Sequence, residues 1–476
     1  MKMHFSIPDT QDLKECKGSG IVGYNVHING IYHCTVRYKQ LHILNEQLKG
    51  EFGHDNLPVF PSKKLLPLSS GQVEERRTLL EKYIQALGQD AKFMSSMHLC
   101  GFLLAAQQET FCNNEKEVNL DIFIMASNQI KVKVSTFDST GKVLAKALRQ
   151  VNLPLDYIQY FSLYLIKVDN SGDIIVLRKF LNFESPYITQ QVIRIATRIV
   201  IRKNYWDMKF DKELMTDPIA LNLLYLQTLS DVERGWIIAM REPKMRLEKL
   251  KLKLAKKEYI EFAQKLKYYG FLQFSQCYCD YPHPGTKVSV AVGDEELSIR
   301  IVGPGNLAKE GVFKVTRMRC WRITATNDKR DITQESSAYS NNEQPNSNLE
   351  LSFEYLMSKD NLRWITISSS QAILMSICLQ SLVDELLLKK NGIKRQDNGT
   401  FNGKWTYMRR DGSCHIMCNH TNLLDSSDDP DNVIERRNEE LFSIKTLQDK
   451  FSSVSFKNGR EFVENQAFEG ISNDDL

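Results

Sequence analysis

The spacing of apolar residues changes several times along this chain of 476 residues, and these changes limit the folds that the chain can adopt. Strand-like alternation begins near residue 20, restarts near residue 116 and returns after residue 271, and stretches with helical spacing separate these regions. The length by itself suggests about three domains. We therefore expect an α+β multidomain protein in which strands and helices form successive units.

The first unit is expected to be a small antiparallel sheet followed by helices. Residues 20–37 alternate around Asn29-Gly30, a strong signal for a two-residue hairpin turn. Three helices are predicted after this hairpin, over residues 38–52, 69–87 and 96–110. Ser69 or Ser70 would cap the second of these helices.

Three further units and a tail are predicted after residue 115. The order of two strands, one helix and two strands in residues 116–203 is that of a ubiquitin-like roll. Residues 204–270 are mostly helical, and residues 271–390 form antiparallel strands closed by one long helix, which suggests a pleckstrin-homology-like barrel. Residues 391–476 lose periodicity and are rich in Asn, Asp, Ser and Lys, so we expect a flexible tail.

The composition excludes several classes of function. The net charge of +4 is too small to indicate nucleic acid as a main partner. There is no run of 18 apolar residues, no apolar leader and no disulfide framework among the ten cysteines, so we expect peripheral membrane contact at most and a reduced, cytosolic setting. Since the nucleotide-binding, hydrolase and zinc-protease motifs are also missing, we expect neither an enzyme nor a cofactor. No metal is expected either, because Cys414, His415, Cys418 and His420 lack the spacing of a recognised zinc finger; a zinc site there is the alternative.

Basic residues in the first eighty positions indicate a phosphate-binding pocket. They lie in HCTVRYKQL (Arg37), in NLPVFPSKK (Lys63) and in QVEERRTLL (Arg76). A phosphoinositide headgroup needs several cations and at least one planar fork, which arginine supplies better than lysine. Tyr38 could lie against the inositol ring, so the set predicts docking on a phosphorylated lipid. A second basic stretch, residues 244–267, is interpreted as a solvated helix face, with a membrane-attracting patch as the alternative.

The long closing helix and one strand before it predict a peptide groove. Val383 and Leu387 form an apolar stripe beside the core stripe of the helix, and the stripe looks half exposed. The strand MRCWRIT offers Trp321, which is flanked by Arg319 and Arg322. An extended peptide could add to this strand and place an aromatic side chain against the helix. Ordinary core packing of Trp321 and Val383 is the alternative.

The chain ends in NQAFEGISNDDL, where Asp474 and Asp475 precede the terminal Leu476. Such an end suits the capture of a free carboxylate by a pocket with a basic rim, and a frayed terminus is the alternative.

These motifs resemble a known family. The pattern RY…P-x-x-P-x-K…R resembles the phox-homology (PX) domain, and residues 1–390 resemble the sorting nexins in which a PX domain precedes an atypical FERM-like module. VTRMRCWRIT, FEYLMSKDNLRW and AFEGISNDDL also carry the resemblance. It implies a PX domain over 1–112, a ubiquitin- or Ras-association-like lobe over 116–203, a helical lobe over 204–270, a PTB/PH-like lobe over 271–390 and a tail over 391–476.

The resemblance implies that the PX domain binds phosphatidylinositol 3-phosphate. Arg37 would hold the 3-phosphate, Tyr38 would pack on the ring, Lys63 would contact the 1-phosphate side, and Arg76 would take the 4- and 5-hydroxyls. Related proteins have Ser where Lys39 stands, and a lysine can still meet a phosphate there.

The resemblance also implies the partners. The groove formed by Arg319, Trp321, Val383 and Leu387 would bind NPxY or NxxY motifs in receptor tails of the LDL-receptor, β-integrin, P-selectin and amyloid-precursor type. The terminal residues Asp474 to Leu476 would recruit the Retriever complex, so that receptors return from early endosomes to the cell surface. A Ras-like GTPase effector that uses the basic strand IKVKV, or a cytoskeletal linker, is the alternative.

Overall fold

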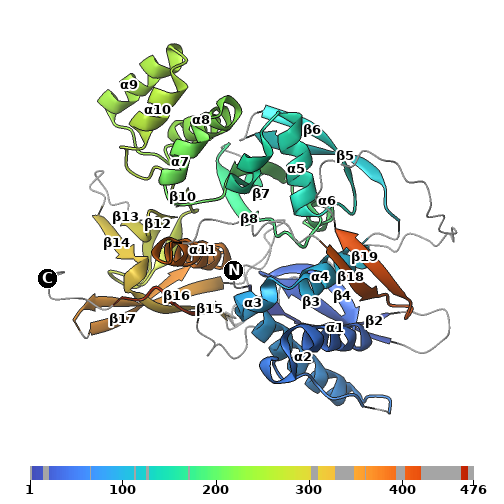
Figure 1. Ribbon diagram of the computed structural model, residues 1–476. Helices are drawn as coiled ribbons and strands as arrows, with labels where there is room; N and C mark the ends of the chain where they lie inside the picture. The colour runs from blue at the N-terminus through green and yellow to red at the C-terminus, as the bar shows by residue number, and fades with distance from the viewer. Residues whose placement is uncertain are drawn as a thin grey trace, which may run out of the picture.

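The computed structural model describes residues 3–13, 21–64, 66–111, 114–124, 128–169, 172–193, 195–301, 309–326, 348–359, 361–392, 403–419 and 463–469. Figure 1 shows four units: one of strands and helices at the lower right, a mixed unit above it, a helical unit at the upper left and a strand-rich unit at the lower left. Among the described residues, no helix is long and apolar enough to cross a membrane.

The first unit is a small antiparallel sheet with helices packed beside it. The predicted hairpin forms at Asn29-Gly30, where both residues have a positive φ of 52° and 79°, and Ser69 caps its helix by accepting a hydrogen bond from the backbone of Gln72. The sheet order is β1-β3-β2, with β4 paired to β3. The elements are β1 (Phe5–Ser6), β2 (Thr10–Leu13), β3 (Ile21–Ile28), β4 (Ile31–Arg37), α1 (Tyr38–Phe52), a 3-10 turn (His54–Asn56), α2 (Ser70–Gln89), α3 (Ala91–Met94) and α4 (Met97–Phe111).

The second unit has the predicted order of two strands, one helix and two strands, and adds a final strand that lies in the middle of the sheet. The sheet order is β6-β5-β9-β7-β8, and β5 and β9 are parallel. The elements are β5 (Glu117–Ile124), β6 (Asn128–Ser135), α5 (Thr140–Gln150), a 3-10 turn (Leu155–Tyr160), β7 (Phe161–Val168), β8 (Ile174–Lys179), α6 (Pro186–Val192) and β9 (Arg198–Lys203).

The third unit is helical, and the fourth is a sheet closed by one long helix. The helices of the third unit are α7 (Lys209–Leu214), α8 (Pro218–Glu233), α9 (Arg241–Leu252) and α10 (Lys256–Ala263). The elements of the fourth are β10 (Leu272–Gln273), β11 (Cys277–Cys279), β12 (Thr286–Gly293), β13 (Glu296–Ile301), β14 (Lys309–Lys314), η3 (Val315–Arg317), β15 (Met318–Thr326), β16 (Asn348–Ser358), β17 (Asn361–Ser368) and α11 (Ala372–Lys390). The core stripe predicted for α11 is buried and consists of Ala372, Met375, Leu379, Leu382 and Leu386.

Polar contacts join the first unit to its neighbours. Gln107 on α4 donates to the hydroxyl of Thr189 at 3.0 Å and accepts from the backbone of Ser185 at 2.7 Å, both in the second unit. His4 lies 3.3 Å from the hydroxyl of Ser376 on α11. The first unit therefore packs against both the second unit and the closing helix of the fourth.

Two pieces of the segment that was expected to be a flexible tail have regular structure, which corrects the expectation there. The strands β18 (Gly403–Met408) and β19 (Cys414–Asn419) form a hairpin beside α4 of the first unit, and β20 (Val463–Glu464) adds to β15 of the fourth. Figure 1 shows the hairpin in orange and red next to α4 and β4. Each piece gains its order from contacts with a distant unit rather than from its own sequence.

Candidate lipid-headgroup and peptide-binding sites

The candidate headgroup site begins where β4 meets α1. Arg37 is the last residue of β4 and the N-cap of α1, and its backbone N–H donates to Gln40 Oε1 at 2.8 Å. Tyr38 is the first residue of the helix. The first N–H groups of a helix carry a partial positive charge, so an anion beside this junction meets both the helix end and the Arg37 guanidinium.

Tyr38 brings three segments of the chain together. Its hydroxyl donates to the carbonyl of Pro61 at 2.8 Å, and the guanidinium carbon of Arg76 on α2 lies 4.3 Å from the centre of its ring. Burial raises the pKa of Tyr38, and the nearby charge of Arg76 opposes that rise. Arg76 Nη2 is buried and has no hydrogen-bond partner among the described residues. Tyr38 thus links the start of α1, the proline loop and α2.

Lys39 and Lys63, the other two predicted headgroup residues, are exposed. Neither has an ion-pair partner in the part of the chain that the structure describes. Arg77 differs, because it pairs with Glu74 at 2.6 Å and with Glu81 at 2.9 Å. The structure thus joins Tyr38 directly to Arg76, whereas Lys39 and Lys63 are exposed to solvent.

The proline loop next to Tyr38 presents apolar side chains to solvent. Val59 is 92% exposed and Leu66 is 80% exposed, on either side of Pro61, which is buried. Large apolar side chains beside a basic pocket are typical of a surface that dips into the boundary of a bilayer.

The candidate peptide groove is already filled by a piece of the same chain. β20 runs antiparallel to β15, with Val463 opposite Trp321 and Glu464 opposite Cys320. The next residue, Asn465, donates from its backbone to the carbonyl of Arg319 at 3.0 Å. This is the strand addition that the sequence predicts for a bound peptide.

Asn465 fixes the segment through its side chain. Its Nδ2 donates to the carbonyl of Val315 at 2.8 Å and to that of Met318 at 2.7 Å, and its Oδ1 accepts from the backbone of Ala467 at 2.9 Å. The backbone of Phe468 donates to the carbonyl of Asn465 at 3.2 Å, which closes a turn. The segment therefore has the form of a strand followed by an Asn-x-x-aromatic turn.

Two further contacts hold the end of this segment. The backbone of Glu469 donates to the carbonyl of Thr316 at 2.6 Å, and its carboxylate pairs with Lys390 at the end of α11. Val463 and Ala467 are buried in the same apolar cluster as Trp321 and Val383.

The predicted groove residues are less exposed than the sequence suggested. Trp321 is fully buried, and its indole N–H donates to Ser376 at 3.0 Å. Val383 is also buried, while Leu387 is half-buried at the margin of the same cluster. The expectation of a half-exposed stripe on α11 was wrong because Val463 and Ala467 join this cluster and the first unit contacts Ser376. Arg319 contributes its carbonyl to the segment, and its guanidinium pairs with Glu354.

Ser376 lies between the groove and the first unit. Its hydroxyl accepts from the indole of Trp321 and lies 3.3 Å from His4. Burial lowers the pKa of His4 to about 4, so its ring is neutral at physiological pH. One side chain thus touches both the first unit and the floor of the candidate peptide groove.

The residues expected to bind Retriever, Asp474, Asp475 and Leu476, lie outside the described residues. Phe468 is half-buried where the segment leaves the groove.

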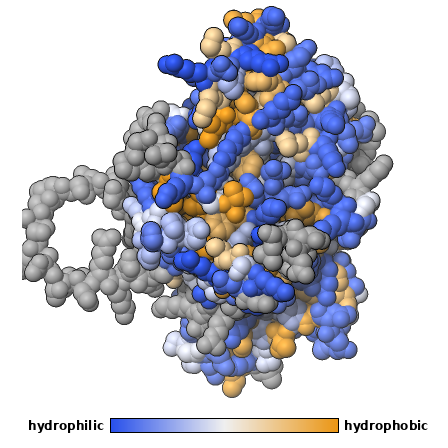
Figure 2. Space-filling view, turned by 90° about the vertical axis from the view of Figure 1, so that its left-hand side faces the viewer, coloured by the Kyte–Doolittle hydropathy of each residue, from blue (hydrophilic) through white to orange (hydrophobic). Residues whose placement is uncertain are grey.

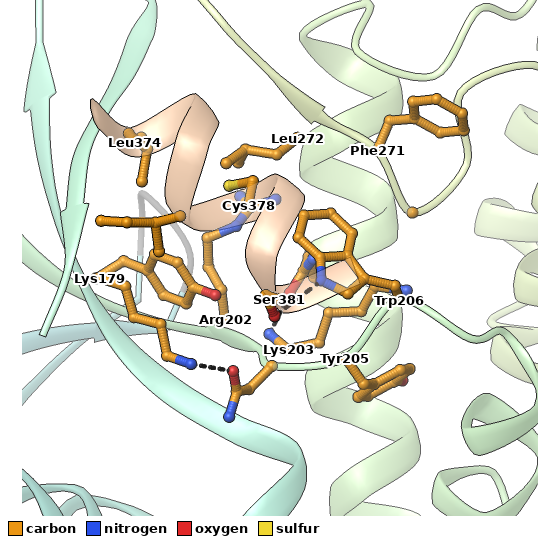
Figure 3. Close-up of a pocket in the computed structure, with 15 residues that line it drawn as sticks. Lys179, Arg202, Lys203, Tyr205, Trp206, Phe271, Leu272, Leu374, Cys378 and Ser381 are labelled. Atoms are coloured by element: carbon orange, nitrogen blue, oxygen red, sulfur yellow. Dashed lines mark hydrogen bonds between the residues drawn. The ribbon is translucent and has the colours of Figure 1, made fainter. Parts of the chain in front are cut away.

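A small pocket lies where the second, third and fourth units meet. Figure 3 shows the basic side chains Lys179, Arg202 and Lys203 between α11 and the neighbouring strands. Arg202 pairs with Asp231 at 3.2 Å, and Lys203 lies 3.8 Å from Asp211. Because Asp231 and Asp211 belong to the third unit, these two pairs hold the second and third units together at the pocket.

The outer face of the helical unit combines apolar and basic side chains. Met245, Lys249 and Leu252 share one face of α9 and are exposed, and Met240 and Leu254 are exposed at its two ends. Figure 2 shows hydrophobic atoms among hydrophilic ones at the top of the molecule, over α9 and α10. An anionic membrane surface attracts such a combination, and a membrane-attracting patch here stays a prediction.

Two elements of these sites were missed by sequence reasoning, although each has a local signal. In KWTYMRRDGSCHIM, apolar residues alternate on either side of Asp411-Gly412, a pair that favours a hairpin turn. Asn465 and Phe468 have the spacing of the motif expected in receptor tails, with Phe in place of Tyr.

Four stretches of the chain match models of known families. The matches are the PX domain over residues 24–106, the F1 lobe of the FERM domain of sorting nexins 17, 27 and 31 over 118–206, the F2 lobe of that of sorting nexins 17 and 31 over 207–267, and the sorting nexin 17 FERM C-terminal domain over 270–387. They follow the order of the four units described above.

Whole-chain relatives agree with these matches. Sorting nexin-17 of Danio rerio is 42% identical over 480 residues and covers 100% of both chains. Sorting nexin-17 of Homo sapiens is 42% identical over 491 residues, also with full coverage of both. Sorting nexin-31 of Homo sapiens is 34% identical over 391 residues, which are 82% of this chain and 87% of that relative.

Proposed function

The chain belongs to the sorting nexin family, in the branch that joins a PX domain to sorting nexin 17-type FERM lobes, and from this membership we propose that it binds phosphatidylinositol 3-phosphate and NPxY- or NxxY-type receptor tails on early endosomes. The resemblance and the fold class predicted from the sequence are confirmed. A sorting nexin with these domains is an endosomal sorting adaptor that associates with membranes peripherally.

The segment Asn465-x-x-Phe468 in the groove is the observation that carries the peptide part of the proposal. The Asn465 side chain donates to the carbonyls of Val315 and Met318, and its backbone donates to the carbonyl of Arg319. These contacts support the proposal that an Asn-x-x-aromatic peptide would use the same three carbonyls. All three acceptors are backbone carbonyls, so their positions are set by the fold. The groove would therefore select Asn because its side-chain amide reaches two of these carbonyls at once. A receptor tail of the same pattern would occupy the place of the segment.

The decisive experiment compares two synthetic receptor-tail peptides on the full chain. One contains NPxY and the other has Ala in place of its Asn, and binding is measured by isothermal titration calorimetry. We expect the Asn→Ala peptide to bind at least tenfold more weakly, because each hydrogen bond of this kind contributes about 0.5–1.5 kcal/mol and the two carbonyls would remain unsatisfied. Equal binding of the two peptides would remove the basis of the proposal.

Arg37, Tyr38 and Arg76 support the lipid part, with Lys39 and Lys63 as exposed cations around them. An exposed apolar loop beside cations suits a charged headgroup in a bilayer. Arg37→Gln should abolish sedimentation with vesicles that contain phosphatidylinositol 3-phosphate, while Arg77→Gln, in which the lost guanidinium is already paired with Glu74 and Glu81, serves as the matched control. Undiminished sedimentation of Arg37→Gln would contradict the assigned pocket.

The C-terminal residues Asp474, Asp475 and Leu476 are proposed to recruit Retriever. They follow the groove segment by five residues, so a receptor tail that displaces the segment would also release this end of the chain. Confinement of lipid, receptor and Retriever contacts to one membrane allows each of them to be weak. Removal of Leu476 should abolish co-precipitation of Retriever and leave peptide binding intact; a truncated chain that still co-precipitates it would refute this part.

A second candidate function, that of a Ras-like GTPase effector, is favoured by one observation. β6 is an edge strand of the second unit, and Lys131 and Lys133 on it are exposed. Lys133 pairs with Glu117 at 2.6 Å, and both side chains are largely solvated. Retention of the full chain on a GTP-loaded but not a GDP-loaded GTPase, and its loss in Lys131→Glu, would support this function.

A further inference from the structure

The hairpin of β18 and β19 is anchored in the first unit, although about 290 residues separate the two in sequence. Trp405 and Tyr407 are buried within the apolar core of that unit. The indole of Trp405 lies against Gly101 of α4, and any Cβ added at Gly101 would overlap indole atoms. A glycine inside a helix is unfavourable by roughly 1 kcal/mol relative to alanine, and here its missing side chain makes the space that the indole fills.

Buried polar contacts add to this anchor. The hydroxyl of Tyr407 donates to Glu109 at 2.6 Å, and the backbone of Arg410 donates to the other oxygen of the same carboxylate at 2.7 Å. Gln40 on α1 donates to the carbonyl of Met408 at 2.9 Å. With two buried aromatic side chains and these bonds, the hairpin is a fixed part of the first unit, since a mobile flap would have to break all of them.

The turn of the hairpin lies at the candidate headgroup site. Arg37 Nη1 donates to the carbonyl of Arg410, and a Cβ built on Gly412 would lie 4.0 Å from Lys39 Nζ. The turn itself is closed by a hydrogen bond from the backbone of Arg409 to the carbonyl of Ser413 at 2.8 Å. It therefore stands beside both basic residues at the start of α1, and it adds the exposed side chain of Arg409 to that surface.

We propose that this hairpin is part of the headgroup site: its turn positions the Arg37 guanidinium for the phosphate of a 3-phosphorylated inositol lipid and extends the basic rim with Arg409. The inference rests on the proposed lipid binding and deepens it. A guanidinium that is held by a neutral carbonyl keeps its charge and loses less freedom when a phosphate binds, because its orientation is already set. Arg410 acts through Arg37 and is a positioning residue.

The test uses Gly101→Ala in the full chain. Alanine is a better helix former than glycine, and the three atoms nearest to the new Cβ all belong to the Trp405 indole, so the substitution should displace the hairpin while α4 remains intact. We expect about tenfold weaker binding to vesicles that contain phosphatidylinositol 3-phosphate, and a similar loss for soluble inositol 1,3-bisphosphate. The soluble probe separates recognition of the headgroup from contact with the bilayer.

A second variant and two controls keep the test decisive. Trp405→Ala removes the anchor from the other side, and the double variant should lose no more affinity than either single one. Ile416→Ser alters an exposed side chain of the same hairpin and should bind lipid like the wild type, and NPxY peptide binding should be unchanged in all variants.

Each outcome has a separate meaning. Unchanged or tighter lipid binding in Gly101→Ala and Trp405→Ala, with hairpin displacement shown by new proteolytic cleavage between residues 403 and 419, would overturn the inference while lipid binding by the wild type still stood. A wild-type chain that fails to bind the vesicles would instead overturn the proposed lipid function.

Discussion

Replacing Asn465 by alanine should open the peptide groove. The Asn465 side chain is buried and makes two hydrogen bonds to carbonyls, at 2.8 Å and 2.7 Å, and accepts one at 2.9 Å. Each such bond contributes a net of about 0.5–1.5 kcal/mol, so the loss of all three weakens the closed arrangement by about 1.5–4.5 kcal/mol, with a middle value of about 3 kcal/mol. At the middle value, the ratio of chains with a filled groove to chains with an open groove falls by a factor of roughly 140.

The expected readout is a gain in affinity for receptor tails. A peptide binds only to the open groove, so its apparent dissociation constant equals the intrinsic one divided by the open fraction. Where the closed form predominates, Asn465→Ala should tighten binding of a fluorescent NPxY peptide by up to the same factor, as measured by anisotropy on the full chain. Deletion of residues 463–476 sets the upper limit of this gain.

Gln466→Ala is the matched control, because Gln466 is exposed in the same segment. Its affinity for the peptide should equal that of the wild type. Unchanged or weaker peptide binding in Asn465→Ala, with the same thermal unfolding midpoint as the control, would refute the reasoning that the segment and the receptor tail compete for one groove.

Two further predictions concern the first unit. Val59→Asp should weaken sedimentation with phosphatidylinositol 3-phosphate vesicles several-fold and leave binding of soluble inositol 1,3-bisphosphate unchanged, because Val59 is 92% exposed and lies beside Pro61 rather than in the pocket; an equal loss for both probes would show that Val59 is needed for the pocket itself. Burial lowers the pKa of His33 to about 3 from its ordinary value of 6.5, so the unfolded chain takes up a proton below pH 6.5 that the folded chain refuses. The contribution of His33 to the free energy of unfolding is therefore complete above pH 6.5. It is lost as the pH falls, by about 1.4 kcal/mol per pH unit, which amounts to about 2 kcal/mol at pH 5. Between pH 7 and pH 5, the urea concentration at the unfolding midpoint should fall further in the wild type than in His33→Gln. Equal falls in the two proteins would contradict this prediction.

The order of the four units could be read from local patterns. The hairpin at Asn29-Gly30 depends on residues that adopt positive φ, and the start of α2 at Ser69 depends on a side chain that caps the first backbone N–H groups. Both signals act within a few residues, and the structure agrees with each. The resemblance to the sorting nexins was likewise carried by contiguous motifs, such as VTRMRCWRIT.

Where residues 403–419 and 463–469 pack could not be inferred in the same way, although each stretch has a local signal. β18 and β19 have six residues each and β20 has two, which is too short for a stable sheet in isolation. Trp405 finds its place only because α4 has a glycine at position 101, and Asn465 finds its acceptors only where η3 meets β15. The spacing of apolar residues within these short stretches does not indicate which distant residues they contact.

The sequence by itself determined the succession of folds and the family and pointed to the residues of both candidate sites, because local backbone preferences and contiguous motifs encode them. Only the tertiary structure decided what covers those sites: an Asn-x-x-Phe segment in the peptide groove, and the turn of a hairpin beside Arg37. The physical reason is that burial depends on which distant surface a short segment meets. Trp321 and Val383 are buried for this reason, although the half-exposed stripe read from α11 alone suggested an open groove.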